Sequence, residues 1–483
     1  MSRLYDCIKR YSETFPDNIS FTFREGEAYA HISYSQLYEH INTLSSFLTE
    51  YKGKTIALIG NNKLEYADCL LSVICNVGNA FLIDKELSEE DVVNVFSQKK
   101  PDLIILDDDL DFVFENYEVL KFSDVREVLK TRRDFDNDAS FSGGLILHTS
   151  GTTGIPKCVR LDEQNYFGVI PELNRKWNVT SEQSCMLIIP LYHIYALVSL
   201  FHGLYAGINN ILEYDYKRLN VLLKETKPCL FMGVPLMYNR IKDAIFEKSG
   251  KKVKTAIKIS NALRKIGIDV RKKIFKEIHE FFGGRYIFGC SAGSVLPYET
   301  NKFFNDVGLP VYNVYGMTET SGPIAINYQN HNDYKSVGEI LDINRVEIIN
   351  KDSEGVGSVF VKGGNVFSGY IRDDKKDYFL DGYFDTGDIG YIKGNNLYVI
   401  GRKKNILIGD NGKNISPEEI NKKILKNNKI HDCNVIMENN RLTAIVNTEL
   451  SEDELKRFIA KVNDKLPKYK NIYKFKITDK KIK

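Results

Sequence analysis

The sequence predicts an α/β protein: a large N-terminal domain of two α/β subdomains plus a β-barrel-like subdomain, then a small mobile α+β C-terminal domain. Three observations predict this. Helical and strand-like segments alternate over residues 1–325, short strand candidates crowd residues 326–402, and a mixed pattern returns in residues 403–483, a region that is short for a domain. A chain of 483 residues also exceeds what one hydrophobic core usually holds, so at least two units are expected.

The first region alternates between two kinds of apolar spacing. Residues 34–51 and 65–77 place apolar side chains at helical intervals, whereas residues 54–60 and 101–106 are short apolar runs of the kind found in buried strands. Strands that alternate with helices usually form a parallel sheet covered by helices on its faces. We therefore expect a parallel sheet here.

The second region favours antiparallel pairing. Strand candidates are residues 346–349, 358–362, 390–393 and 397–400, and a Gly-Asn-Asn turn at 394–396 joins the last two as a hairpin. In the third region the spacing predicts the following order: helix 417–425, strand 433–437, strand 442–446, helix 452–466 and strand 473–477. That order is typical of a separate small domain.

Composition and charge exclude several classes of protein. The chain has 66 basic and 64 acidic residues and a net charge of +2, which gives no reason to expect nucleic-acid binding. The N-terminal residues lack the apolar stretch of a secretory signal, and no apolar run is long enough for a membrane span. Eight scattered cysteines fit reduced thiols better than disulfides or zinc. We expect a cytoplasmic protein.

Two charged runs have simple explanations. The acidic run 107–109 is expected to be a solvated loop. Residues 250–276 are rich in Lys and Arg, which predicts a solvated helical face. Contact of that face with a membrane or with substrate phosphates is the alternative, so peripheral membrane association stays open.

The strongest local signal is residues 147–157, Leu-His-Thr-Ser-Gly-Thr-Thr-Gly-Ile-Pro-Lys, which follow a predicted strand. Hydroxyls and glycines give a flexible backbone whose N–H groups can surround phosphate oxygens, and Lys157 adds a positive charge. The pattern is not the Walker sequence G-x-x-x-x-G-K-[ST], because its glycines are three residues apart and Cys158 follows the lysine. An ordinary Ser/Thr/Gly turn is the alternative.

Further motifs follow this loop along the chain. In order the segments are 149–157 (TSGTTGIPK), 190–197 (PLYHIYAL), 233–238 (GVPLMY), 315–319 (YGMTE), 385–388 (DTGD), 401–405 (GRKKN) and 411–420 (NGKNISPEEI). The chain resembles the adenylate-forming enzymes: acyl-CoA synthetases, peptide-synthetase adenylation domains and luciferases. The resemblance covers nearly the whole chain and implies an ATP-dependent acid–thiol ligase that uses Mg²⁺.

The resemblance also implies roles for individual residues. It places phosphate contacts in the loop, an adenine slot near Tyr315, a metal ligand at Glu319 and a ribose contact at Asp388. The implied cofactor-binding residues are Thr149, Ser150, Gly151, Thr152, Thr153, Gly154, Gly293, Asn313, Tyr315, Gly316, Met317, Thr318, Asp388 and Arg402. The implied catalytic residues are Lys157, His193, Glu319 and Lys481, and Lys404 is the implied hinge. Simple alternatives are core packing for Tyr315 and for His193, an Asx-turn for Asp388 and a solvated loop for Lys404.

The C-terminal motif departs from the family pattern. The family carries a lysine in T-x-x-G-K, and residues 478–482 (TDKKI) match it loosely, with Lys480 in place of the glycine. Lys481 is the candidate for the catalytic lysine, and a frayed basic terminus is the alternative. If no lysine serves, adenylation should suffer more than thioester formation.

The substrate segment favours an apolar acid. Residues 192–197 contain no carboxylate to pair with an α-ammonium, and His193 could close over the carboxylate site of a fatty or aryl acid. Three hypotheses remain: a ligase with CoA as the acceptor, a ligase that loads a carrier protein, and a ligase-like protein that binds nucleotide or acyl group with weak turnover.

Overall fold

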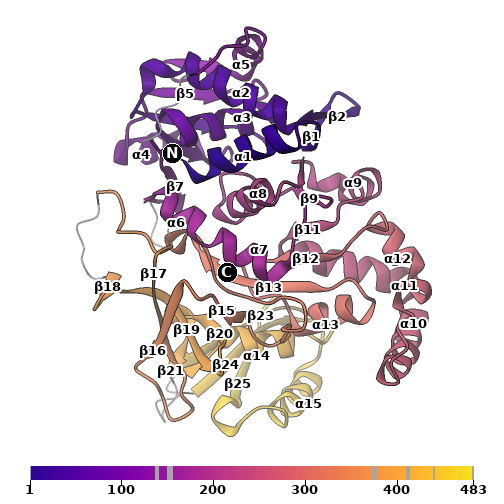
Figure 1. Ribbon diagram of the computed structural model, residues 1–483. Helices are drawn as coiled ribbons and strands as arrows, with labels where there is room; N and C mark the ends of the chain where they lie inside the picture. The colour runs from indigo at the N-terminus through magenta and orange to yellow at the C-terminus, as the bar shows by residue number, and fades with distance from the viewer. Residues whose placement is uncertain are drawn as a thin grey trace. The chain divides into compact units, whose positions relative to one another are not determined.

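The computed structural model describes residues 2–135, 141–149, 156–372, 378–408, 414–438 and 441–480 (Figure 1). They form two compact units. The larger unit contains Met1–Asn344 and Gly363–Lys376, and the smaller unit contains Arg345–Lys362 and Asp377–Lys483. The mixed α/β class is confirmed. The boundaries proposed after residues 325 and 402, and the mobility of the last region, stay a prediction.

The first sheet of the larger unit has six strands in the order β6-β5-β3-β4-β7-β8. All pairs are parallel except β7 with β8, which are antiparallel. The strands are β3 (Thr55–Ile59), β4 (Asn79–Ile83), β5 (Leu103–Leu106), β6 (Val119–Lys121), β7 (Leu145–Thr149) and β8 (Lys157–Leu161). The predicted buried strands and parallel pairing are therefore confirmed.

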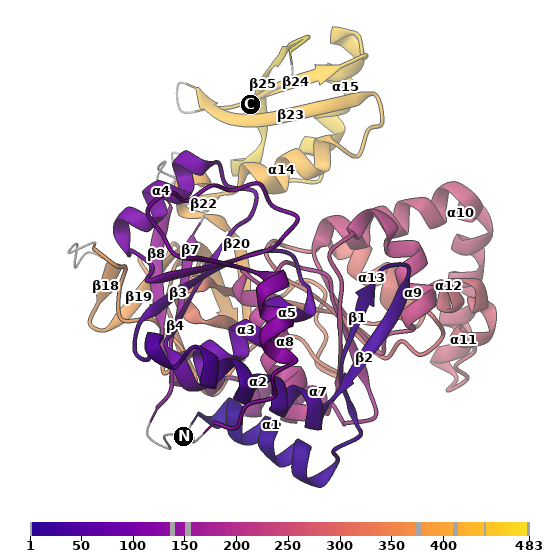
Figure 2. The same cartoon turned by 90° about the horizontal axis from the view of Figure 1, so that it is seen from above.

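Helices cover both faces of this sheet (Figure 2). The helix α4 (Glu89–Gln98) buries Val92, Val95 and Phe96 against strand residues in one apolar cluster. On the other face lie α2 (Tyr34–Phe47), α3 (Leu64–Ser72) and α5 (Phe122–Leu129), whose apolar side chains meet each other and the sheet. The predicted helix 65–77 ends as one π-helical turn at Val73–Val77.

The second sheet of the larger unit runs β15-β14-β13-β12-β11-β9-β10-β1-β2. Its central strands are parallel, whereas β2, β14 and β15 pair antiparallel with their neighbours. The strands are β1 (Ile19–Glu25), β2 (Ala28–Ser33), β9 (Ser184–Leu187), β10 (Asn209–Leu212), β11 (Leu230–Gly233), β12 (Phe288–Ser291), β13 (Val311–Met317), β14 (Gly322–Ile326) and β15 (Gly338–Ile340).

The helices around this sheet include one that is apolar on every side. The helix α8 (Ile194–Ala206) is buried along almost its whole length, which suits a helix at the centre of a large unit. The other helices are α1 (Arg3–Thr14), α6 (Glu163–Gly168), α7 (Ile170–Trp177), α9 (Leu219–Thr226), α10 (Pro235–Lys265), α11 (Arg271–Ile274), α12 (Lys276–Phe281) and α13 (Tyr298–Asp306). No helix within the described ranges is both long and apolar enough to cross a membrane.

The smaller unit contains the predicted hairpin and the predicted small domain. Strands β19 and β20 pair antiparallel, and Gly394 turns the chain with φ +62°. The strands are β16 (Asn344–Ile349), β17 (Gly357–Gly363), β18 (Phe379–Leu380), β19 (Tyr383–Lys393), β20 (Asn396–Arg402), β21 (Leu407–Ile408), β22 (Asn414–Ile415), β23 (Ile430–Glu438), β24 (Arg441–Thr448) and β25 (Ile472–Ile477). The helices α14 (Pro417–Ile424) and α15 (Glu452–Asn463) share one apolar core with β23–β25.

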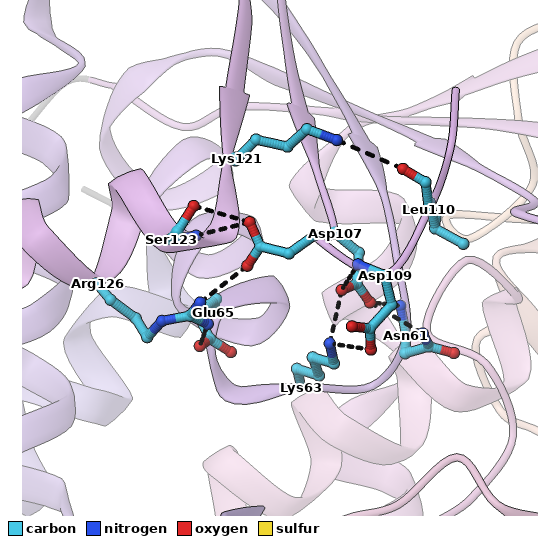
Figure 3. A network of polar contacts seen from close by, with 10 residues as sticks. Asn61, Lys63, Glu65, Asp107, Asp109, Leu110, Lys121, Ser123 and Arg126 are labelled. Carbon is cyan, nitrogen blue, oxygen red and sulfur yellow. Dashed lines mark hydrogen bonds and ion pairs between the residues drawn. The ribbon is translucent and has the colours of Figure 1, made fainter. Parts of the chain in front are cut away.

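The acidic run is not a solvated loop throughout, so that prediction was wrong for Asp107. Its side chain is fully buried at the end of β5 and bonds to Lys63 Nζ at 2.6 Å and to Asn61 (Figure 3). Burial would raise the pKa of Asp107, but these bonds outweigh burial and hold the pKa below its ordinary value. Asp109, which also contacts Lys63, is 62% exposed. Sequence spacing did not reveal the long-range lysine partner.

Replacing Asp107 with Asn should lower the free energy of unfolding by about 3 kcal/mol at pH 7, because it removes the buried carboxylate beside the largely buried Lys63 and leaves that lysine with the exposed Asp109 as its carboxylate partner. Because the folded pKa is lowered, the stabilisation is complete above the unfolded pKa of about 3.9 and is lost as pH falls through the folded pKa. Urea denaturation between neutral and acidic pH checks both points. Asp109→Asn is the matched control, with an expected loss below about 1 kcal/mol; equal losses would contradict the assignment.

Candidate active site

Two polar residues meet at the carboxyl edge of the six-stranded sheet. Asp84 follows β4 and His148 lies near the end of β7, and these strands are parallel neighbours. The Asp84 N–H donates to His148 Nε2 at 3.0 Å. Sequence analysis missed both residues, although ligands of open α/β sheets bind at the carboxyl ends of strands, which could have indicated them.

The predicted substrate histidine lies close to the same group. His193 caps the start of α8, and its ring centroid is 4.6 Å from that of Tyr192. Neighbouring protein atoms partly desolvate the His193 ring, which lowers its pKa. The negative charges of Asp84 and Glu86 act in the opposite direction and raise the pKa. Burial also lowers the pKa of His148, and His193 lowers it further. Both rings are therefore neutral at pH 7, so His193 can donate a hydrogen bond but adds no positive charge.

The ends of the predicted phosphate loop are held together by a hairpin. Thr149 in β7 pairs with Lys157 in β8, and Thr149 Oγ1 donates to the Lys157 carbonyl at 3.4 Å. The five central residues, Ser150, Gly151, Thr152, Thr153 and Gly154, lie outside the described residues, and their phosphate contacts stay a prediction. The hairpin holds Thr149 and Lys157, the two ends of the loop, opposite each other.

Tyr370 connects this hairpin with the predicted metal ligand. Its hydroxyl donates to Glu319 Oε1 at 2.7 Å, and its ring centroid lies 5.0 Å from Lys157 Nζ. The segment is held beside β8 by an antiparallel bridge between Val159 and Tyr370 and by the Ile371 N–H, which donates to the Cys158 carbonyl at 2.8 Å. Tyr370 thus brings the predicted metal ligand and the loop lysine into one group. No spacing in the sequence indicates this contact.

Glu319 lies in a tight turn. It is 6% exposed in the 3₁₀ turn η4 (Thr318–Thr320), which follows β13. Ser321, which ends this turn, has φ +50°, a strained conformation for a residue with a side chain. No group of three or more His, Cys, Asp or Glu side chains that could hold a metal was found in the described ranges. A single carboxylate suits Mg²⁺, which commonly takes one or two carboxylates together with phosphate oxygens and water.

Replacing Tyr370 with Phe should lower kcat/KM for ATP by about 10-fold, because the variant loses one hydrogen bond to a carboxylate but keeps the ring beside Lys157. The concentration of Mg²⁺ needed for half-maximal rate should rise, since the missing bond positions the Glu319 carboxylate. Steady-state rates across a Mg²⁺ series check both effects. Tyr328→Phe removes a similar tyrosine–glutamate contact, to Glu339, and should change neither quantity. An unaltered Mg²⁺ requirement in Tyr370→Phe would refute the positioning role.

Two buried polar side chains lie next to each other on the neighbouring strands β12 and β13. Asn313 Nδ2 donates to the Ser336 carbonyl at 2.9 Å, which leaves Asn313 Oδ1 buried without a partner within the described ranges. Ser291, its neighbour across the strands, also has a buried Oγ without a described partner. Buried polar atoms are rarely left unpaired, so both atoms are suited to a ligand with hydrogen-bond donors, such as the amino group of adenine.

The backbone at Gly293, two residues after Ser291, has open space beside it. No described atom lies within 4 Å of the position that a Cβ on Gly293 would occupy. Gly316 is different: a Cβ there would lie 1.9 Å from the Gly322 carbonyl, so Gly316 is needed for the close approach of β14. Tyr315 is half-buried, and the Met317 N–H donates to Thr320 Oγ1 at 3.1 Å. The contacts of Tyr315, Met317 and Thr318 with nucleotide stay a prediction.

The smaller unit holds the predicted ribose contact. Asp388 and Arg402 face each other across β19 and β20, with Arg402 Nε 3.1 Å from Asp388 Oδ1. Arg402 Nη1 also donates to the Thr386 carbonyl at 3.0 Å. The Asx-turn belongs to Asp385, whose Oδ1 accepts the Gly387 N–H at 2.9 Å. Asp388 is therefore a buried carboxylate oriented by an arginine.

Lys404, the predicted hinge, lies within the described residues, whereas Lys481, the predicted catalytic lysine, does not. Lys404 is exposed in the short 3₁₀ turn η6 (Lys403–Asn405) directly after β20. Its role as a hinge stays a prediction. Lys481 lies outside the described residues, so its position relative to the other groups stays a prediction as well.

Polar residues at the carboxyl edge of an open α/β sheet are an arrangement typical of nucleotide-binding α/β proteins. The chain belongs to the AMP-binding enzyme family, whose sequence profile matches residues 8–371. The resemblance that the motifs indicated is thereby confirmed.

Relatives and solved structures agree with this assignment. The chain is 27% identical over 301 residues to a human long-chain-fatty-acid–CoA ligase, covering 56% of this chain and 45% of the relative. It is 30% identical over 332 residues to a peroxisomal long-chain acyl-CoA synthetase of Arabidopsis thaliana, covering 63% and 47%. The chain thus spans about half the length of these curated relatives. An o-succinylbenzoate CoA synthetase of Bacillus subtilis, solved with ATP and magnesium, has the same fold: TM-score 0.75, 19% identity, 98% and 96% covered.

Proposed function

We propose that the protein is an ATP-dependent acid–thiol ligase that forms an acyl-AMP and then a thioester, with CoA as the acceptor. The observation that carries the proposal is the contact of Tyr370 with both Glu319 and Lys157. It places a buried carboxylate, the type of group that holds Mg²⁺, beside the lysine of the phosphate loop.

The first half-reaction joins two anions. A carboxylate oxygen of the acid attacks the α-phosphorus of ATP, and the bond to the bridging oxygen of pyrophosphate breaks. Bound Mg²⁺, held by Glu319, would neutralise phosphate charge. Lys157 and the loop N–H groups would bind the phosphates, Asn313 would accept the adenine amino group, and Asp388 would accept the ribose hydroxyls. Within the larger unit Asn313 and Glu319 are each held by a hydrogen bond, to the Ser336 carbonyl and from the Tyr370 hydroxyl, so these two groups would lower the barrier by orientation and by electrostatic stabilisation.

The second half-reaction transfers the acyl group. The thiol sulfur attacks the acyl carbon, the bond to the AMP oxygen breaks, and the thiol proton passes to solvent. The acid is proposed to be a fatty or aryl acid, because the segment around Tyr192 has no carboxylate for an α-ammonium. Both relatives described above are named as long-chain fatty-acid or acyl-CoA ligases, which favours a fatty acid.

The experiment that tests the proposal measures pyrophosphate release and thioester formation with fatty, aryl and α-amino acids. The expected result is release that depends on one class of apolar acid, with an acyl-CoA product. If the product were an acyl thioester on a phosphopantetheine carrier protein, with no acyl-CoA, the acceptor would be the carrier protein and not CoA. ATP binding without release for any acid would favour a nucleotide-binding protein with weak turnover and would contradict the proposal.

Replacing Lys481 with Ala should lower acid-dependent pyrophosphate release by about 10²-fold, because a positive charge near the attacking carboxylate and α-phosphate would be lost. Thioester formation from synthetic acyl-AMP should keep its rate, since that step no longer joins two anions. Lys480→Ala is the matched control, because Lys480 is exposed next to it and should be dispensable. Equal rates for both variants would show that Lys481 is not the catalytic lysine.

A further inference from the structure

Residues 248–276, which we name the basic arm, carry a large excess of positive charge. The arm contains eleven Lys and Arg and one acidic residue, a net charge of +10, whereas the whole chain has +2. The arm is the C-terminal half of α10, beyond a kink at Ser249, together with α11. In both views of the larger unit α10 and α11 lie on the side away from α4 (Figures 1 and 2).

Lysines and exposed isoleucines alternate in a regular way along the arm. Lys251, Lys258 and Lys265 are exposed and lie seven residues apart. Ile259 and Ile266 each follow a lysine and are 53% and 70% exposed. A seven-residue spacing is close to two helical turns, so these side chains run along one side of α10. That side therefore combines a row of charges with a row of large apolar groups.

The opposite side of the arm packs on the protein. Val253 and Ser260 are buried, as expected for the inner side of the same helix. The one acidic residue of the arm, Asp269, forms an ion pair with Arg271, whose Nη2 lies 2.6 Å from Asp269 Oδ2. Asp269 therefore does not neutralise the lysines of α10. Ile268 and Ile274 are 49% and 40% exposed and extend the apolar surface toward α11.

We propose that the basic arm docks the protein on an anionic phospholipid surface. Lysines near such a surface are attracted by the headgroup charge, and isoleucines between them can enter the boundary between headgroups and acyl chains. An acidic protein or a polynucleotide would form ion pairs with the lysines but would leave the side chains of Ile259 and Ile266 exposed to water. The inference goes beyond the proposed ligase activity and does not depend on it, although a docked enzyme would meet fatty acids where they dissolve.

The test is sedimentation of the full chain with phosphatidylcholine vesicles that either contain or lack phosphatidylserine. Binding is expected only with phosphatidylserine and should weaken as salt screens the charges. The triple variant Lys251→Glu, Lys258→Glu, Lys265→Glu should bind on the order of 100-fold more weakly. The matched control Lys456→Glu, Lys461→Glu, Lys465→Glu reverses three exposed lysines of the smaller unit and should bind like the unaltered protein.

A second pair of variants separates membrane insertion from charge attraction alone. Ile259→Ser with Ile266→Ser keeps every charge and should weaken vesicle binding by at least about 10-fold, because two large apolar groups no longer leave water. Val93→Ser with Val113→Ser alters two other exposed residues, 61% and 73% exposed, and should have no effect. Equal binding to both vesicle types, or unaltered binding in both arm variants, would overturn the proposal whatever the ligase assays show.

Discussion

Replacing Glu319 with Gln is expected to lower acid-dependent pyrophosphate release by about 10³-fold, because the stabilisation of phosphate charge by a bound metal contributes several kcal/mol. The amide keeps the shape of the side chain and can still accept a bond from Tyr370, so folding should be unaltered. The loss therefore reports on the carboxylate charge. Excess Mg²⁺ should restore part of the rate, because the defect lies in holding the metal beside the phosphates.

The matched control for this prediction is Glu339→Gln. Glu339 is also bonded by a tyrosine, Tyr328, and belongs to the same unit. It should keep nearly the full rate, because it lies in β15 and has no predicted contact with ATP. If Glu319→Gln released pyrophosphate at the unaltered rate at every Mg²⁺ concentration, Glu319 would not be the metal ligand.

Replacing Asp388 with Ala should lower kcat/KM for ATP by about 10³-fold, because two hydrogen bonds from ribose to a charged group contribute roughly 2 kcal/mol each. The variant should also lose discrimination against 2′-deoxy-ATP and 3′-deoxy-ATP, since the carboxylate that accepts both hydroxyls is absent. Comparing kcat/KM for ATP and the two deoxy analogues measures this directly.

Asp385→Ala is the control for the ribose prediction. Asp385 lies in the same turn and accepts the Gly387 N–H, so its loss disturbs the turn without removing the proposed ribose acceptor. It should retain the discrimination against deoxy analogues even if the rate falls. Retained discrimination in Asp388→Ala would contradict the ribose assignment and leave Asp388 as a partner of Arg402 alone.

Much of the fold follows from local patterns. The apolar runs 54–60 and 101–106 contain the buried strands β3 and β5, and the Gly-Asn-Asn segment at 394–396 forms the turn of the hairpin between β19 and β20. These features depend on neighbours in the chain, so a short window of sequence contains the cause. The motifs named residues 149–157, Asp388 and Arg402, whereas the β7–β8 hairpin and the cross-strand pair of Asp388 and Arg402 came from the structure.

The contacts that sequence analysis missed all join distant segments. Tyr370 reaches Glu319 across 51 positions, and Asp84 reaches His148 across 64. Asp107 looked solvated because its own neighbours are acidic, yet Lys63 lies 44 positions earlier. The Asp84 and Asp107 contacts arise where parallel strands place their carboxyl ends together, whereas an antiparallel bridge to β8 positions Tyr370. Neither kind of pairing is contained in local periodicity. The pairing of strands, more than the motifs, therefore completes the candidate site.

The most direct test of the proposed chemistry follows an oxygen atom. The protein is incubated with ATP, Mg²⁺, CoA and an apolar acid whose carboxylate carries ¹⁸O, and the AMP is analysed by mass spectrometry. Attack of the carboxylate on the α-phosphorus predicts one labelled oxygen in AMP, together with pyrophosphate and acyl-CoA. Unlabelled AMP, or ADP with labelled inorganic phosphate, would contradict formation of an acyl-AMP.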